Sequence, residues 1–263
     1  MNKILYAFLS VLALTSCSKS FTIQGSSNVS TLDGHMLYLK VVSDTTMKNV
    51  DSCEVVHGQF HFKGSVDSVC MGTIFMDQDY VLPVVLEDGD ITIKLDNTQQ
   101  DVSGTPLNDS LTTFRNKLMQ LQNQVQEMVN AEYQGYATGS NMDEVYAKLN
   151  ARQMQLNEKI DKLMSGFVVE NFDNVLGPWA FSLHTSSYEY PMLDPWIEDI
   201  MSKATDKFKN DPYVKDYYAK AQENQQIMNG TKMPASPAVP PQNLGQPMAA
   251  PTPNELAKPK QEL

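Results

Sequence analysis

The sequence has few cysteines and lacks the common catalytic motifs, and these absences restrict the functions open to it. Its 263 residues include three cysteines, and no two of them have the Cys-x-x-Cys spacing of a thioredoxin-type site. A P-loop, a dinucleotide-binding glycine pattern and a Gly-x-Ser-x-Gly elbow are also absent. We therefore expect a protein that is not an enzyme and that carries no cofactor and no metal.

Positive charge is also scarce. The chain has 20 Lys and Arg against 31 Asp and Glu, which gives a formal net charge of −11 at pH 7. A nucleic-acid-binding domain needs a basic surface to meet phosphates, so nucleic acid is excluded as a partner. The hydrophobic content of 41% is enough for a core, and the length suits one or two domains.

The chain has no apolar run long enough to span a membrane, but a short one lies at the N-terminus. It follows Lys3 and extends from Ile4 to Leu14, about eleven residues where a spanning helix needs about twenty. This is typical of a secretory signal. The stretch Leu12-Ala-Leu-Thr-Ser-Cys17 resembles a bacterial lipoprotein box. The resemblance implies that residues 1–16 are removed, although a plain signal peptide cut elsewhere is the alternative.

The same resemblance implies that Cys17 carries lipid and anchors the protein to a membrane. Several acyl chains together hold a protein firmly at a bilayer. The residues that follow, Ser18-Lys19-Ser20, form no acidic run. We expect an outer-membrane lipoprotein of a bacterial cell envelope that faces the periplasm.

The other two cysteines, Cys53 and Cys70, leave two interpretations open. An oxidising compartment permits a disulfide between them. A free cysteine, however, is often buried and packs as a small hydrophobic side chain.

Residues 17–103 are predicted to form an antiparallel β-sandwich or small barrel, because short alternating runs are separated by turn residues. The turn His57-Gly58 predicts a tight hairpin in which Gly58 has a positive φ. The turn Glu87-Asp-Gly-Asp90 predicts another hairpin. The predicted strands cover residues 35–42, 48–56, 59–64, 69–76, 80–86 and 91–95.

Residues 104–229 are predicted to form a helical hairpin or bundle, which makes the fold class α+β. Apolar residues recur at steps of three and four after Thr105-Pro106 and again after Asn141, so two long antiparallel helices are expected. The stretch from Asn174 to Pro178 is expected to end this hairpin. Asp194-Pro195 and Asp211-Pro212 each predict the start of a further helix.

Residues 230–263 are rich in proline, alanine and glutamine and have almost no large apolar side chains. Such a segment cannot bury enough surface to offset the entropy of ordering, so a disordered, extended tail is expected. Deleting residues 231–263 should then leave the thermal midpoint of unfolding nearly unchanged.

The chain resembles one known family through structural residues. The segments are Leu37-Tyr-Leu-Lys40, Val50-Asp-Ser-Cys53, Gly58-Gln-Phe-His-Phe-Lys-Gly64 and Gly104-Thr-Pro-Leu-Asn108. They resemble the uncharacterised β-rich domain, with its following helices, that opens many lipid-anchored thiol–disulfide interchange proteins of gut Gram-negative bacteria. The resemblance covers roughly residues 21–221. The thioredoxin-like module that follows in such proteins has no counterpart here.

Two further groups of residues leave a choice between binding and structure. His57 and His61 are too few for a metal site and are expected on the surface. The aromatic residues Trp179, Tyr188 and Trp196 either line a groove or pack between helices.

The sequence thus predicts a non-catalytic lipoprotein that acts as a binding or scaffold module for another envelope protein. The alternative is an accessory in envelope thiol–disulfide homeostasis that works with a separate thioredoxin-like protein. That alternative depends on the resemblance and on Cys53 and Cys70.

Overall fold

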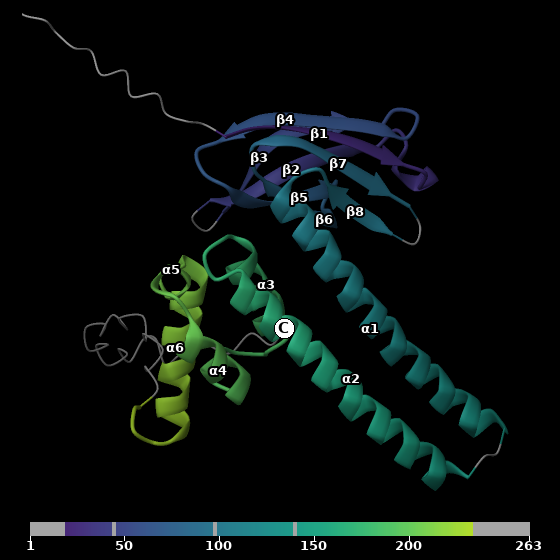
Figure 1. Cartoon of the computed structure of the whole chain (residues 1–263), viewed down its shortest axis with the longest axis vertical. Helices are drawn as coiled ribbons and strands as arrows, with labels where there is room; N and C mark the ends of the chain where they lie inside the picture. Colours follow the sequence, from purple (N-terminus) through teal and green to yellow (C-terminus); the bar gives the residue numbers. More distant parts are fainter. Residues whose placement is uncertain (1–18, 44–45, 97–98, 139–140, 234–263) are drawn as a thin grey trace, which may run out of the picture.

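The structure, a computed structural model, describes residues 19–43, 46–96, 99–138 and 141–233. The predicted signal, Cys17 and residues 234–263 lie outside this part. A sandwich of two four-stranded sheets is followed by six α-helices within the described residues, which confirms the α+β class (Figure 1). Of these helices, none is both long enough and apolar enough to cross a membrane.

The two sheets of the sandwich have the strand orders β4-β1-β7-β8 and β3-β2-β5-β6. Neighbouring strands are antiparallel except for β1 and β7, which run parallel. A 3₁₀ turn, η1 (Ser30–Leu32), precedes β2. The strands are β1 (Lys19–Ser27), β2 (Met36–Ser43), β3 (Thr46–Glu54), β4 (Gln59–Val66), β5 (Cys70–Met76), β6 (Asp79–Leu86), β7 (Gly89–Leu95) and β8 (Gln100–Ser103).

Both turns that the sequence marks as hairpins instead connect the two sheets. At the first, His57 and Gly58 have φ values of 51° and 70°, as the turn residues require, and Val56 still bridges to Gln59. Beyond that bridge, β3 pairs with β2 and β4 pairs with β1. At the second, β6 and β7 also belong to different sheets. The predicted hairpin at residues 87–90 is therefore wrong, because a strand pattern specifies the buried face and leaves the pairing partner open.

Alternate side chains of the strands fill the space between the sheets, as the period-two pattern predicts. Phe60 and Phe62 both point inward, with exposed fractions of 4% and 0%. Their rings meet edge to face with centroids 6.0 Å apart. This core occupies the sandwich interior with side chains of its own.

The helix α1 (Pro106–Thr138) begins against the edge of the sandwich and extends away from it for about 50 Å, at 1.5 Å per residue (Figure 1). Its first turn is capped from the sandwich, because Glu87 Oε1 accepts hydrogen bonds from the N–H groups of Leu107 at 2.9 Å and Asn108 at 3.3 Å. The N–H groups of a helix start have no partner within the helix, so Glu87 supplies one.

The second long helix, α2 (Met142–Glu170), returns antiparallel to α1, which confirms the predicted helical hairpin. Asn141 caps it by accepting from Asp143 N–H. The helix α1 continues through Gly135 and ends at Thr138. The helices after the hairpin are α3 (Leu176–Thr185), α4 (Pro195–Lys203), α5 (Asp206–Lys209) and α6 (Pro212–Met228).

The helix α3 is absent from the sequence prediction, which ends the hairpin at residues 174–178. Pro178 lies in the first turn of α3, where its missing N–H costs nothing. The starts of α4 and α6 at Asp194-Pro195 and Asp211-Pro212 are confirmed, with each Asp side chain accepting backbone N–H groups.

The helices α3–α6 gather beside the last part of α2 and pack on the sandwich (Figure 1). Val85 of β6 is fully buried in the helical core, while its neighbours Val84 and Leu86 are buried in the sandwich core. Val69 and Met71 also pack against the helical core. The helical core thus covers the outer face of β5 and β6. This contact holds the helices against the sandwich.

Candidate functional site

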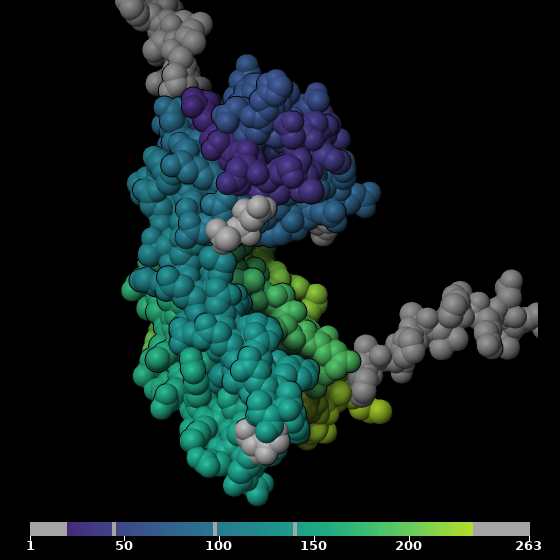
Figure 2. All heavy atoms as spheres, turned by 90° about the vertical axis from the view of Figure 1, so that its right-hand side faces the viewer, coloured from purple at the N-terminus to yellow at the C-terminus, as the bar shows by residue number. Residues whose placement is uncertain are grey.

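A groove lies where the sandwich meets the helices, and its volume is about 520 Å³. The outline of the molecule is indented between these two parts in the space-filling view (Figure 2). We call this cavity the junction groove. It is lined by Ser68, Val69, Leu107, Phe172, Asp173, Asn174, Val175, Pro178, Lys207, Asn210 and Asp211.

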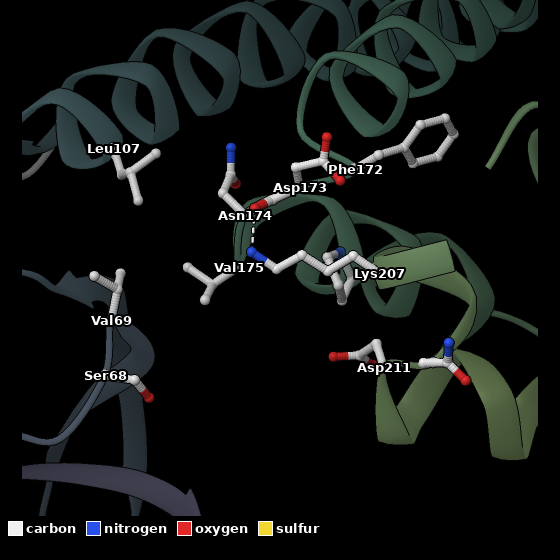
Figure 3. A pocket seen from close by; sticks show the side chains of 11 residues that line it. Ser68, Val69, Leu107, Phe172, Asp173, Asn174, Val175, Lys207 and Asp211 are labelled. Atoms are coloured by element: carbon white, nitrogen blue, oxygen red, sulfur yellow. Dashed lines mark hydrogen bonds between the residues drawn. The ribbon is translucent and has the colours of Figure 1, made fainter. Parts of the chain in front are cut away.

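The floor of the junction groove is apolar and comes from three separate segments. Val69 lies just before β5, Leu107 lies in the first turn of α1, and Val175 precedes α3. Figure 3 shows Val69 and Leu107 on one side of the groove and Val175 on the other. All three side chains are half-buried against the helical core, so the floor is part of a packed structure.

The rim of the junction groove is polar, and Lys207 is its cation. Its Nζ donates a hydrogen bond of 2.6 Å to the carbonyl oxygen of Asp173 (Figure 3). The Asp173 carboxylate accepts from Thr205 Oγ1 at 2.9 Å. Asp211 caps α6 by accepting the N–H groups of Tyr213 and Val214 through one oxygen. The rim therefore offers a cation and two carboxylates to a ligand.

The loop between α2 and α3 is held in one shape by two asparagines. Asn171 Nδ2 donates to Phe167 O at 2.8 Å, and Asn174 Nδ2 donates to Asn171 Oδ1 at 2.8 Å. Asn174 Oδ1 in turn accepts from Leu176 N–H. A Cβ atom on Gly177 would lie 2.4 Å from Asn171 O, so only glycine fits there. This wall of the junction groove is therefore preformed.

Of the residues singled out from the sequence, Cys17 lies outside the described part, and Cys53 and Cys70 are free thiols. Both lie in the same sheet, on β3 and β5, with β2 between them. Cys53 is paired with Leu37 of β2, and Leu37 is paired on its other side with Met76 of β5. Cys70 is six residues from Met76 along β5. At about 3.3 Å per residue this offset is about 20 Å, whereas a disulfide needs Cα atoms within about 7 Å. The disulfide that the sequence left open is therefore absent.

Both thiols are poorly suited to exchange chemistry. Burial raises the pKa of the Cys53 thiol, and the nearby Asp51 carboxylate also raises it. A backbone hydrogen bond from His61 lowers this pKa, but the net shift is upward. Burial also raises the pKa of the Cys70 thiol. The nucleophile in thiol exchange is the thiolate, so a raised pKa reduces the reactive fraction.

The remaining candidates from the sequence have structural positions. His57 and His61 are exposed, and within the described ranges no group of three or more His, Cys, Asp or Glu could hold a metal ion. Trp196 stacks on His184 with ring centroids 3.8 Å apart. Trp179 packs edge-on against Phe114. The aromatic residues thus pack mainly between helices.

Two family models match parts of the chain. Residues 21–111 match DUF4369, described as a domain of unknown function. Residues 1–18 match the prokaryotic membrane lipoprotein lipid attachment site, which supports membrane anchoring through a lipid. No curated protein matches the chain. The DUF4369 match covers the sandwich and the first turns of α1, and so includes Val69 and Leu107 of the junction groove.

The sequence prediction missed the junction groove entirely. Its residues come from the segment before β5, the start of α1, the α2–α3 loop and the region of α5 and α6. No local pattern connects Ser68 with Lys207, because their proximity depends on how the helices pack on the sandwich. The turn residues Asn174 and Asp211 carry a local signal, but that signal concerns helix ends.

Proposed function

We propose that the protein is a lipid-anchored, non-catalytic binding module of the cell envelope, whose junction groove holds an extended segment of another envelope protein. The observation that carries the proposal is the groove itself, at about 520 Å³. Binding cavities in proteins commonly have volumes of about 300–1,000 Å³, with an apolar lining and a few placed polar groups.

The composition of the junction groove favours a polypeptide as the occupant. Val69, Leu107 and Val175 can contact apolar side chains of a bound segment. Ser68 and Asn210 are exposed beside them and can hydrogen-bond to its backbone. Because both walls belong to one packed unit, binding would need little reorganisation of the groove.

For the location, we propose the outer membrane, with the body of the protein facing the periplasm. The lipid attachment site at residues 1–18 supports the anchoring. Cell fractionation should find the protein with outer-membrane markers, and a Cys17→Ser variant should leave the membrane fraction. Digestion by protease added to intact cells would contradict the periplasmic orientation.

The alternative function in thiol–disulfide homeostasis receives no support from the positions of Cys53 and Cys70. Both thiols are half-buried on strands, and burial raises the pKa of each. We therefore place the function in binding and leave redox chemistry out of the proposal.

Site-specific photo-crosslinking in cells tests the junction groove. A photoreactive phenylalanine derivative at position 68 would lie in the groove, and the same residue at position 123 on α1 would lie outside it. We expect a distinct adduct from position 68 and none from position 123. Mapping the crosslinked peptide should identify one segment of an envelope protein.

Two charge reversals serve as a matched pair for this experiment. Lys207→Glu changes the rim of the junction groove, whereas Lys209→Glu makes the same change in the same short helix outside the groove. Only the first should reduce the adduct. Lack of any adduct at position 68 would overturn the proposal, and so would an adduct to residues 234–263, which would assign the groove to the protein's own C-terminal segment.

A further inference from the structure

A second cavity, of about 410 Å³, lies where the sandwich edge meets α1 and α3. We call it the Arg115 cavity. Tyr80 of β6, Gln100 of β8 and Trp179 of α3 line it together with Arg115. It shares none of its lining residues with the junction groove.

The Arg115 guanidinium is partly buried and is held by neutral groups. Its Nη1 donates to the carbonyl oxygen of Gln100 at 3.3 Å, and its Nη2 donates to Gln100 Oε1 at 3.0 Å. Throughout the described residues, no carboxylate lies within ion-pairing distance of it. A guanidinium has five N–H donors, so three remain beyond the two bonds to Gln100.

Among the described residues, the charge of Arg115 is thus positioned without a carboxylate in direct contact. Burial lowers the pKa of Arg115, while the nearby Tyr80 and Asp101 raise it, and an arginine side chain stays protonated in a protein. Two acidic side chains of this region are bound to other donors. Asp101 accepts from Asn116 Nδ2 at 3.2 Å, and Asp96 accepts from Gln99 N–H at 2.5 Å.

The walls of the cavity restrict what could supply the missing anion. Among the described lining residues Arg115 is the one cation and Asp96 the one carboxylate, and Asp96 accepts the Gln99 N–H, so Arg115 is the group that an anion with a single charge would meet. The planar guanidinium matches the two oxygens of a carboxylate, and such charge-assisted bonds are stronger than neutral ones. Leu118 and Trp179 give the cavity an apolar wall.

We propose that the Arg115 cavity binds a small carboxylate ligand, whose carboxylate pairs with Arg115 and whose apolar portion lies against Leu118 and Trp179. Such a carboxylate could belong to a peptide C-terminus or to an acidic sugar. The chemistry recognised is the same, and the probes below separate the two sources.

The protein offers a direct reporter for this binding, because Arg115 and Arg152 are its two arginines. Arg152 lies on α2 and its nearest acidic contact is Glu127 at 3.8 Å, so it serves as an internal control. In ¹⁵N-labelled protein the two Nε–H signals can be followed separately. Titration with N-acetyl-leucine or glucuronate should shift the Arg115 signal in a saturable manner and leave the Arg152 signal in place.

The uncharged analogues N-acetyl-leucine amide and glucose should bind at least ten times more weakly than the acids. Arg115→Gln should weaken binding of the effective acid at least tenfold by calorimetry. Lys117→Gln removes the same charge from the same helix at an exposed position and should leave binding unchanged.

If Arg115→Gln fails to fold, Tyr80→Ala at the exposed rim should weaken binding at least threefold. Equal shifts of both arginine signals, or no shift with either acid up to 20 mM, would overturn the proposal.

Discussion

Asn108 hydrogen-bonds both backbone groups of Val85, as a neighbouring strand would. Its Oδ1 accepts from Val85 N–H at 2.8 Å and its Nδ2 donates to Val85 O at 2.8 Å. Thr112, one turn further along α1, makes the same double contact with Val102 at the edge of the other sheet, at 3.0 and 2.6 Å. The helix α1 thereby closes the edges of both sheets, which would otherwise expose unpaired backbone groups.

This relationship predicts that Asn108→Ala strongly destabilises the protein. Asn108 and Val85 are fully buried, so the substitution leaves two backbone groups without partners. We expect the free energy of unfolding to fall by about 2–6 kcal/mol, since each of the two unsatisfied buried groups costs about 1–3 kcal/mol. Urea denaturation followed by circular dichroism measures this. Asn123→Ala, at an exposed position of the same helix, should change stability by less than about 0.5 kcal/mol. Equal effects of the two substitutions would contradict the role of Asn108.

The cap that Glu87 provides for α1 leads to a second prediction. Glu87→Ala removes the acceptor for the N–H groups of Leu107 and Asn108 and should destabilise the protein by about 1 kcal/mol. Glu87→Gln keeps an oxygen acceptor and loses only the charge that complements the helix dipole, so its cost should be smaller. Denaturation of both variants at one pH gives the comparison, and a larger loss in Glu87→Gln would contradict it.

A third prediction concerns pH and His184, which lies in the last turn of α3 and faces α4. Its Nε2 is 2.9 Å from the Tyr188 hydroxyl, and its ring stacks on Trp196. Desolvation lowers the pKa of His184. The negative charges of Asp194 and Asp161 raise it by a smaller amount, so the pKa is lowered overall. The unfolded chain therefore binds a proton more readily than the folded chain. The stabilising contribution of neutral His184 is complete above pH about 6.5 and declines as the pH falls below that value.

Thermal midpoints at pH 7.5 and 5.5 test this sign. The thermal midpoint should decrease less between pH 7.5 and 5.5 in His184→Gln than in the unchanged protein. His61→Gln removes an exposed histidine on β4 and should leave the decrease as it is. The same decrease in all three proteins would show that His184 does not contribute.

Thiol mapping gives a fourth prediction. Because Cys53 and Cys70 are free and burial raises the pKa of both thiols, each should react with iodoacetamide more slowly in the folded protein than in denaturant. Mass spectrometry of the denatured protein should find both alkylated without prior reduction. If the two thiols of the denatured protein were alkylated only after a reductant was added, the redox alternative would be favoured. Fast alkylation of the folded protein at pH 7 would favour it as well.

The sequence by itself determined the local features of this protein. The positive φ of Gly58 and the helix starts at Asp194 and Asp211 are confirmed, and the alternation of buried positions along β4 places Phe60 and Phe62 inward. Each depends on neighbouring residues, on turn stereochemistry or on a short repeat of buried positions. The lipid attachment site is also a local pattern, and residues 1–18 match it.

Only the tertiary structure decided which strands pair and where the cavities lie. The strand pattern places Val84 and Val85 on opposite faces of β6, but it cannot indicate that a helical core buries the second face. Asn108 likewise shows nothing unusual in the sequence, and Arg115 meets Gln100 only because α1 lies along β8. Strand pairing and the packing of the helices on the sandwich depend on contacts between distant segments. The free energies of these contacts add up over the whole fold, so no single stretch of sequence indicates them.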